Sequence, residues 1–158
     1  MGIVKPHLWF ASGAEEAAAF YASVIPNSRV VGVVTAPPGV PDVEEGAPFV
    51  IDLELDGMAV QLLNAGPAFT LDEAFSLVVE CEDQAQVDHY WAALTADGGT
   101  PGQCGWLTDR FGVSWQVVPK QLVEIFGDYT TDGSRRALAA MFTMGRLDIA
   151  ALEAAAAG

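Results

Sequence analysis

Histidine, the side chain that most readily serves as a general base or metal ligand near neutral pH, is scarce in this sequence. The chain contains only two histidines, His7 and His89. His7 lies near the start of a predicted strand, where its imidazole could be a metal ligand, a general base or a hydrogen-bonded wall residue. His89 falls on the polar side of a predicted helix. His7 is therefore the histidine with a candidate chemical role.

Two carboxylates and an amide share one face of the clearest segment in the chain, FVIDLELDGMAVQLLN, residues 49–64. An Asp-Gly pair between two alternating runs predicts a β-hairpin with a two-residue turn. Counting outward from the turn places Asp52 opposite Gln61, with Glu54 on the same face, and the apolar opposite face should meet a helix. If buried, Asp52 and Glu54 could form an acid–base pair, although a solvated strand face is the commoner arrangement.

A second stretch, QCGWLTDRFGVSWQVVP at residues 103–119, holds two tryptophans and a glutamine in one short run. It predicts a hairpin whose final strand alternates, so that Ser114 and Gln116 share one face while Trp115 packs behind. Core packing is the default role of such tryptophans, and Trp106 is the candidate to line a ligand pocket.

The first half of the chain predicts a strand, a helix and then further strands. The first strand covers residues 4–10, and Ser12 with Glu15 forms a capping-box pattern that should begin the helix. A strand at 30–35 follows, and a loop rich in proline and glycine separates it from the hairpin.

The same order of elements begins again about 70 residues later, a spacing that indicates a structural repeat. A strand at 75–81 precedes a helix that Asp83 should cap, and short strands close the second half at 113–118. A helical tail follows and should pack on the domain or on a second subunit. Its predicted helices are 120–126, 134–144 and one that begins after Asp148.

The composition argues against several classes of partner. The chain has 21 acidic and 7 basic residues and a net charge of -14, so its surface should repel nucleic acid and anionic membranes. No apolar run reaches the roughly 18 residues that a membrane span needs, and the first residues lack a signal-peptide core. Two cysteines, Cys81 and Cys104, form neither a disulfide framework nor a metal-binding pair. We therefore expect a cytoplasmic globular protein.

Three segments together resemble one known family: HLWFASGAEEAAAFYASVIPNSRV, FSLVVECEDQAQVDHYWAAL and the stretch at 103–119, with LDIAALEAA in the tail. They are similar to the PhnB-like branch of the vicinal-oxygen-chelate superfamily, which includes glyoxalase I and the fosfomycin and bleomycin resistance proteins. Members of this branch often carry a 3-demethylubiquinone-9 3-methyltransferase label. The resemblance implies an α+β, glyoxalase-like fold, in which two paired βαβββ modules form a curved sheet around a cleft. The expected boundaries are about 1–66 and 73–119 for the modules and 120–158 for the tail, within one domain 1–158.

The resemblance also implies where a metal would bind in the members that use one. The matching positions are His7, Gln61, Ser76 and Gln116, on the first and last strands of each module. One imidazole, two neutral amides and a hydroxyl supply no charge against a divalent cation, so we predict no metal and no other cofactor. The two glutamines could equally bind a ligand or satisfy each other. The expected cleft residues are His7, Gln61, Ser76, Gln116, Asp52, Glu54 and Trp106.

Three functions remain open from the sequence. The favoured prediction is a protein that binds a small organic molecule in its cleft without a divalent metal, as a homodimer, and whether it is an enzyme is left open. The first alternative is a metal-dependent glyoxalase-type lyase, isomerase or transferase. The second is the ubiquinone-pathway methyltransferase that the family label implies, although the chain lacks a glycine-rich loop of the kind that holds a nucleotide cofactor.

Overall fold

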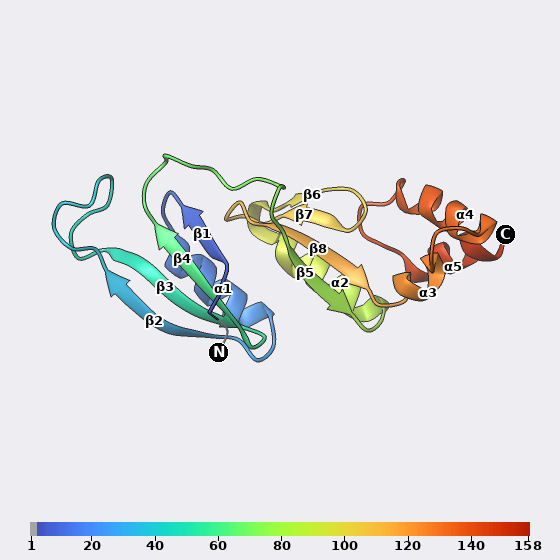
Figure 1. Cartoon of the computed structure of the whole chain (residues 1–158), viewed down its shortest axis with the longest axis horizontal. Coiled ribbons are helices and arrows are strands. Elements are labelled where there is room, and N and C mark those ends of the chain that lie inside the picture. Colours follow the sequence, from blue (N-terminus) through green and yellow to red (C-terminus); the bar gives the residue numbers. More distant parts are fainter. Residues whose placement is uncertain (1–2) are drawn as a thin grey trace. The chain divides into compact units, whose positions relative to one another are not determined.

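The computed structural model describes residues 3–158 and divides the chain into two compact units, Met1–Leu71 and Asp72–Gly158. Each unit contains one βαβββ module, and a helical tail belongs to the second unit (Figure 1). The α+β class, the repeated module and the helical tail predicted from the sequence are therefore confirmed. The pairing of the modules around one cleft stays a prediction.

The first module forms a four-stranded sheet in the order β1-β4-β3-β2. Its elements are β1 (His7–Phe10), α1 (Ala14–Val24), β2 (Arg29–Thr35), β3 (Pro48–Leu55) and β4 (Met58–Asn64). Alternate residues of the strands, such as Ile51, Leu53 and Leu62, are buried on the face that α1 covers with Ala17 and Tyr21. The opposite face of this sheet is not covered by a helix of its own module (Figure 1), and we call it the open face.

The predicted hairpin forms with the predicted register. Asp56 and Gly57 have φ angles of 44° and 80°, the left-handed conformation that a tight hairpin turn requires. Asp52 lies opposite Gln61, as the alternation predicted. The turn therefore decides which side chains reach the open face.

The start of α1 differs from the prediction. The residue before the helix is Gly13, with φ 80°, and no side chain caps the helix from that position, so the predicted Ser12 capping box is wrong. Asn64 at the end of β4 takes over this role, because its Oδ1 accepts a hydrogen bond from the Ala14 N–H at 2.9 Å. Its Nδ2 donates to Glu15 Oε2 at 2.8 Å and to the Pro48 carbonyl at 2.9 Å. The cap therefore comes from a strand about fifty residues away in the sequence.

The second module repeats the topology with the strand order β5-β8-β7-β6. Its elements are β5 (Leu77–Cys81), α2 (Gln84–Thr95), a 3-10 turn (Ala96–Gly98), β6 (Thr100–Pro101), β7 (Trp106–Thr108) and β8 (Ser114–Pro119). Asp83 caps α2 as predicted, since its Oδ1 accepts a hydrogen bond from the Gln86 N–H at 2.9 Å. β5 begins two residues later than predicted, so Ser76 lies just before the strand.

The tail consists of α3 (Leu122–Phe126), α4 (Asp132–Met141) and α5 (Ile149–Ala157), and it docks on the second module. Gln84 at the start of α2 connects the tail to the module, because its Nε2 donates to the Leu147 carbonyl and its Oε1 accepts from the Ile149 N–H. Leu147 and Leu152 are fully buried, so the tail adds to the core of this unit. None of the helices within residues 3–158 is long and apolar enough to span a bilayer.

Both cysteines are free thiols. Cys81 is buried, and burial together with the negative charge of Asp83 raises the pKa of its thiol to about 11. Cys104 is only half-buried and donates weakly to the Met141 carbonyl. Of the two thiols, Cys81 is therefore the one that is fully buried and poorly reactive.

Candidate functional site

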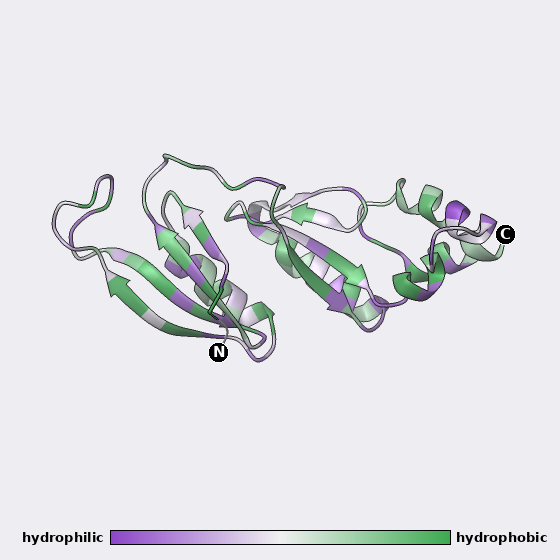
Figure 2. Ribbon diagram, in the orientation of Figure 1, coloured by the Kyte–Doolittle hydropathy of each residue, from purple (hydrophilic) through white to green (hydrophobic). Residues whose placement is uncertain are grey.

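Three rows of side chains cross the open face of the first sheet. Strand pairing places residues side by side, so each row runs from strand to strand. In order, the apolar row is Trp9, Leu63, Val50 and Val34; the polar row is His7, Gln61 and Asp52; and the charged row is Ala59, Glu54 and Arg29. Figure 2 shows that β2 itself is hydrophobic over most of its length. The open face thus sets an apolar surface directly beside hydrogen-bonding groups.

The polar row is connected by hydrogen bonds from end to end. Gln61 Nε2 donates to Asp52 Oδ1 at 2.9 Å, and Gln61 Oε1 lies 3.0 Å from His7 Nδ1. Lys5 Nζ reaches the same Asp52 oxygen at 3.2 Å. The structure therefore brings together three of the predicted site residues and adds Lys5. The first strand was predicted over residues 4–10, but β1 begins only at His7, so Lys5 lies in the segment before it.

Asp52 is held in its charged form. The hydrogen bond from Gln61, and then that from Lys5, lower the pKa of its carboxyl group from the ordinary value. The side chain of Asp52 is 40% exposed, so solvent screens much of this interaction. At neutral pH the carboxylate can only accept hydrogen bonds, and this property decides in which direction the hydrogen bonds of the row run.

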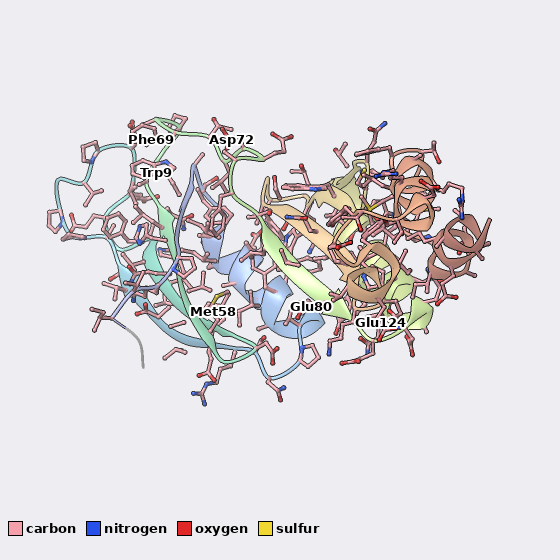
Figure 3. All side chains as sticks on the ribbon, turned by 45° about the vertical axis from the view of Figure 1, so that its right-hand side comes forward. Trp9, Met58, Phe69, Asp72, Glu80 and Glu124 are labelled. Carbon is pink, nitrogen blue, oxygen red and sulfur yellow. The ribbon has the colours of Figure 1, made fainter. Side chains whose placement is uncertain are left out.

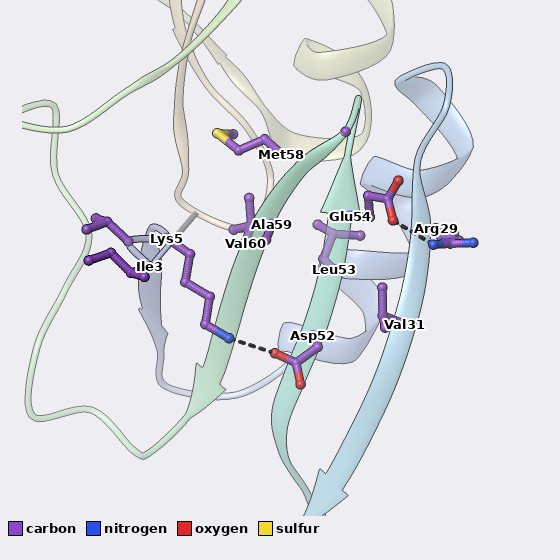
Figure 4. A pocket seen from close by; sticks show the side chains of 12 residues that line it. Ile3, Lys5, Arg29, Val31, Asp52, Leu53, Glu54, Met58, Ala59 and Val60 are labelled. Carbon is purple, nitrogen blue, oxygen red and sulfur yellow. Dashed lines mark hydrogen bonds and ion pairs between the residues drawn. The ribbon is translucent and has the colours of Figure 1, made fainter. Parts of the chain in front are cut away.

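A pocket of about 710 Å³ opens over the charged row (Figure 4). Its walls are mainly apolar and include Val31 and Met58, and the N-terminal segment at Ile3 forms one side. Two ion pairs border it, Lys5–Asp52 and Arg29–Glu54, the latter at 2.7 Å. Both predicted carboxylates therefore border the pocket, each with a cationic partner of its own.

Trp9 extends the open face towards the end of β1. Its indole Nε1 donates to the Gly66 carbonyl at 2.9 Å, and its ring meets Phe69 edge to face at a centroid distance of 5.0 Å (Figure 3). Phe69 lies in the segment after β4 and is 67% exposed. The aromatic pair thus offers an accessible apolar surface next to His7.

The second module has an open face of its own with a comparable central row. Val78, Gln116 and Trp106 lie side by side on β5, β8 and β7. Gln116 Nε2 donates to Ser76 Oγ at 2.9 Å, so these two predicted residues satisfy each other. The stretch at 103–119 is thus the wall of an open face as well as a core hairpin.

Trp115 lies on the other face of β8, against α2, and is 1% exposed. Its Nε1 donates to Asp109 Oδ2 at 2.8 Å, while Oδ1 of the same carboxylate accepts from the Phe111 and Val113 N–H groups. Asp109 is itself buried. The sequence placed Trp115 behind the hairpin and Asp109 in its turn, but it did not indicate that Asp109 is buried or that it accepts these three hydrogen bonds.

The donor set does not fit a divalent metal. Within residues 3–158 no three His, Cys, Asp or Glu side chains are grouped so that they could hold an ion. His7 bonds to Gln61, and Gln116 bonds to Ser76, so the four matching positions are already engaged in pairs. The nearest carboxylate, Asp52, is neutralised by Lys5. In the first module a dication would meet one imidazole, that of His7, and no free anionic ligand, and Ser76 and Gln116 of the second module are both neutral.

The family model described as 3-demethylubiquinone-9 3-methyltransferase matches residues 3–118, which end before α3. Among solved structures, the chain is similar to a PhnB protein from Bacillus cereus, with 28% identity and a TM-score of 0.67 over 75% of this chain and 99% of that one. A protein from Pseudomonas aeruginosa is 19% identical, with a TM-score of 0.62 over 75% and 98% of the two chains. A fosfomycin resistance protein from Listeria monocytogenes, complexed with Mn(II) and sulfate, is 12% identical, with a TM-score of 0.56 over 81% and 97%. No curated protein matches the chain.

Proposed function

We propose that this chain, which belongs to the 3-demethylubiquinone-9 3-methyltransferase family in the PhnB-like branch of the vicinal-oxygen-chelate superfamily, binds a small organic molecule. The binding requires no divalent metal. The ligand lies on the open face of the first module, over the polar row and the pocket beside it. Ser76, Gln116 and Trp106 form the corresponding surface of the second module, and we propose them as ligand-binding residues of that module.

The polar row carries this proposal. His7, Gln61 and Asp52 bond to one another in a line, and Lys5 balances the carboxylate charge. A dication at this row would gain one imidazole, that of His7, as a strong ligand, because Gln61 is a neutral amide and Asp52 is already paired with Lys5. An organic molecule that forms hydrogen bonds with these side chains needs no anionic ligand from the row.

The pocket supports an amphipathic ligand of modest size. Its volume of about 710 Å³ lies in the range typical of small-molecule sites, roughly 300–1,000 Å³. Apolar walls with a few fixed polar groups favour a molecule with an apolar body and one or two hydrogen-bonding groups. Val31, Met58 and Val60 provide apolar area in the pocket, and Asp52 with its partner Lys5 provides polar groups at its border.

Neither alternative function has a specific observation in its favour. A glyoxalase-type reaction depends on a metal, and the donor set does not fit one. The strand-to-helix connections of the two modules, residues 11–13 and 82–83, contain a single glycine between them, so they offer no nucleotide-binding loop for methyl transfer. The methyltransferase description is therefore not carried over to this chain.

A thermal-shift screen of amphipathic small molecules in the presence of EDTA tests the proposal. We expect hits whose stabilisation is unchanged by EDTA and is lost in Gln61→Leu, while Glu153→Gln, an exposed change on α5, binds normally. Hits that disappear on adding EDTA would contradict metal-free binding. Hits that survive Gln61→Leu but are lost in a variant of the second module would place the ligand elsewhere.

We also propose that the protein is a cytoplasmic homodimer. Within the part of the chain that the structure describes, β2 is an edge strand that pairs only with β3, and its four valines are between 39% and 59% exposed. Native proteins usually protect such an edge with charges or cover it, and a second subunit is the cover we propose. Light scattering coupled to gel filtration should give twice the chain mass; a monomer at micromolar concentration would contradict this.

A further inference from the structure

We infer that Asp52 and Gln61 are positioning residues that hold neutral His7 in one tautomer, with its proton on Nδ1 and a free lone pair on Nε2. The site therefore selects ligands that donate a hydrogen bond to Nε2 from a hydroxyl or N–H group carried on an apolar body. This inference rests on the proposed function for the choice of ligand, but the tautomer itself is a property of the free protein.

The first step concerns the direction of the bond between Asp52 and Gln61. Asp52 is ionised at neutral pH, as an aspartate paired with an ammonium group is, and Lys5 Nζ lies 3.2 Å from its Oδ1. A carboxylate has no proton to give, so the Gln61 atom 2.9 Å from Oδ1 must be the amide nitrogen. Asp52 therefore fixes the orientation of the Gln61 amide, a choice that an isolated glutamine leaves open.

The second step carries that orientation to the imidazole. With its nitrogen turned to Asp52, Gln61 presents its carbonyl oxygen to His7, 3.0 Å from Nδ1. A carbonyl oxygen only accepts, so Nδ1 must carry a proton. When His7 is neutral, Nε2 then has no proton and exposes a lone pair. The two hydrogen bonds from Asp52 through Gln61 to His7, which we call the relay, thus exclude the neutral tautomer protonated on Nε2.

The third step concerns what Nε2 can reach. His7 is exposed on the open face, and the bond to Gln61 is the one hydrogen bond of its side chain within residues 3–158. Trp9 lies two residues along the same strand and on the same face. A ligand that rests its apolar part on Trp9 can therefore place a donor at Nε2. A ligand that offers only acceptors there would meet a lone pair.

Nitrogen-15 NMR of the uniformly labelled protein at pH about 8, where an ordinary imidazole is neutral, tests the tautomer without any ligand. Long-range proton–nitrogen correlations distinguish the protonated nitrogen from the unprotonated one in each ring. We expect His7 to be protonated at Nδ1 only, and the exposed His89, whose ring meets Tyr90 edge to face, serves as an internal reference. His7 protonated on Nε2 would overturn the inference.

Two carboxylate variants separate the relay from the general charge of the face. Asp52→Asn can both donate and accept, so Gln61 is no longer held one way, and we expect a mixture of His7 tautomers. Glu54→Gln changes the next carboxylate on the same strand, which pairs with Arg29 and not with Gln61, and should leave the His7 spectrum unchanged. An unchanged His7 in Asp52→Asn, or an equal change in both variants, would show that Asp52 does not set the tautomer.

The ligand class is tested with phenol and anisole, two rings of similar shape of which only phenol has a donor. We expect phenol to shift the His7 Nε2 resonance upfield in a saturable titration, and anisole to leave it in place. Equal shifts, or no shift with either, would overturn the proposed ligand class. Because the tautomer is read without ligand, it can fail while binding persists, and binding can fail while the tautomer stands.

Discussion

Gln61 donates to Asp52 across the β3–β4 hairpin, with 2.9 Å between Nε2 and Oδ1. The two residues are direct partners in the antiparallel register. This partnership follows from the position of the turn, because pairs counted outward from Asp56 and Gly57 bring Asp52 opposite Gln61. A register shift of one residue would turn the side chains of one strand towards α1, so the turn and the polar row depend on each other.

The charge of Asp52 should appear as a pH-dependent contribution to stability. Its folded-state pKa is lowered, by Gln61 first and then Lys5, so its stabilisation is present above the unfolded-state pKa and is lost as pH falls through the folded-state value. Since the side chain is 40% exposed, we expect Asp52→Asn to lower the free energy of unfolding by no more than about 1 kcal/mol near neutral pH.

Urea unfolding at pH about 7, 5 and 3 measures this difference. The gap between wild type and Asp52→Asn should be the same at the two higher values and should shrink at the lowest. Glu153→Gln should show no gap. A gap that grows as the pH falls would mean that the sign of the pKa shift is wrong.

Asn64 should matter to the first module more than any other capping residue. Asn64→Ala removes an acceptor from the Ala14 N–H and two donated bonds inside the unit. A buried group left without its partner costs about 1–3 kcal/mol, and we expect a loss of this size in urea unfolding. Ser12→Ala is the matched control, because Ser12 is exposed and caps nothing. An equal loss in both variants would restore the capping box that the sequence predicted.

The contrast between Ser12 and Asn64 shows which features of the fold a local sequence pattern cannot predict. Local signals worked where the cause was local: the hairpin register follows from its turn, and the Asp83 cap lies next to the helix that it begins. Ser12 had the correct residue type and spacing, but Asn64 supplied the bond from a distant strand. Tertiary contacts of this kind have no signature in a single sequence.

Part of the candidate site was likewise predicted from the sequence, and part was not. His7, Gln61 and Asp52 were each identified as site residues, and alternation placed Asp52 opposite Gln61. The family and its glyoxalase-like fold were also recognised from the sequence, and both are confirmed. The ion pair between Lys5 and Asp52 was not predicted, because residues 4–10 were expected to form one strand, whereas β1 begins at His7 and Lys5 lies in the segment before it. Strand alternation says nothing about such a segment.

Asp109 should be the most sensitive carboxylate in the second module. It is 3% exposed and accepts from two backbone N–H groups and from the Trp115 indole. Hydrogen bonds to a charged group contribute about 1.5–3 kcal/mol, so Asp109→Ala should lower the free energy of unfolding by at least that much and alter the fluorescence of Trp115. Glu82→Gln, which breaks an exposed ion pair with Lys120, should change it by less than about 1 kcal/mol. Similar losses in the two variants would contradict the assigned role.

The two cysteines should differ in reactivity towards iodoacetamide. Burial beside Asp83 raises the Cys81 pKa to about 11, so very little reactive thiolate is present near pH 8, and its sulfur is also inaccessible. Cys104 is half-buried and should react faster. Mass spectrometry should find one modified cysteine in the folded chain and two after denaturation. Modification of folded Cys104→Ser at a comparable rate would contradict the burial of Cys81.

The metal content of untagged protein tests the central claim most directly. The protein would be incubated separately with Ni²⁺, Zn²⁺, Mn²⁺ and Fe²⁺, freed of excess metal and measured by inductively coupled plasma mass spectrometry. We expect far less than one metal ion per chain in every case, because His7 offers a single imidazole and the carboxylate of Asp52 in the same row is paired with Lys5. Near-stoichiometric metal that disappears in His7→Ala would contradict metal-free binding and would favour glyoxalase-type chemistry at this site.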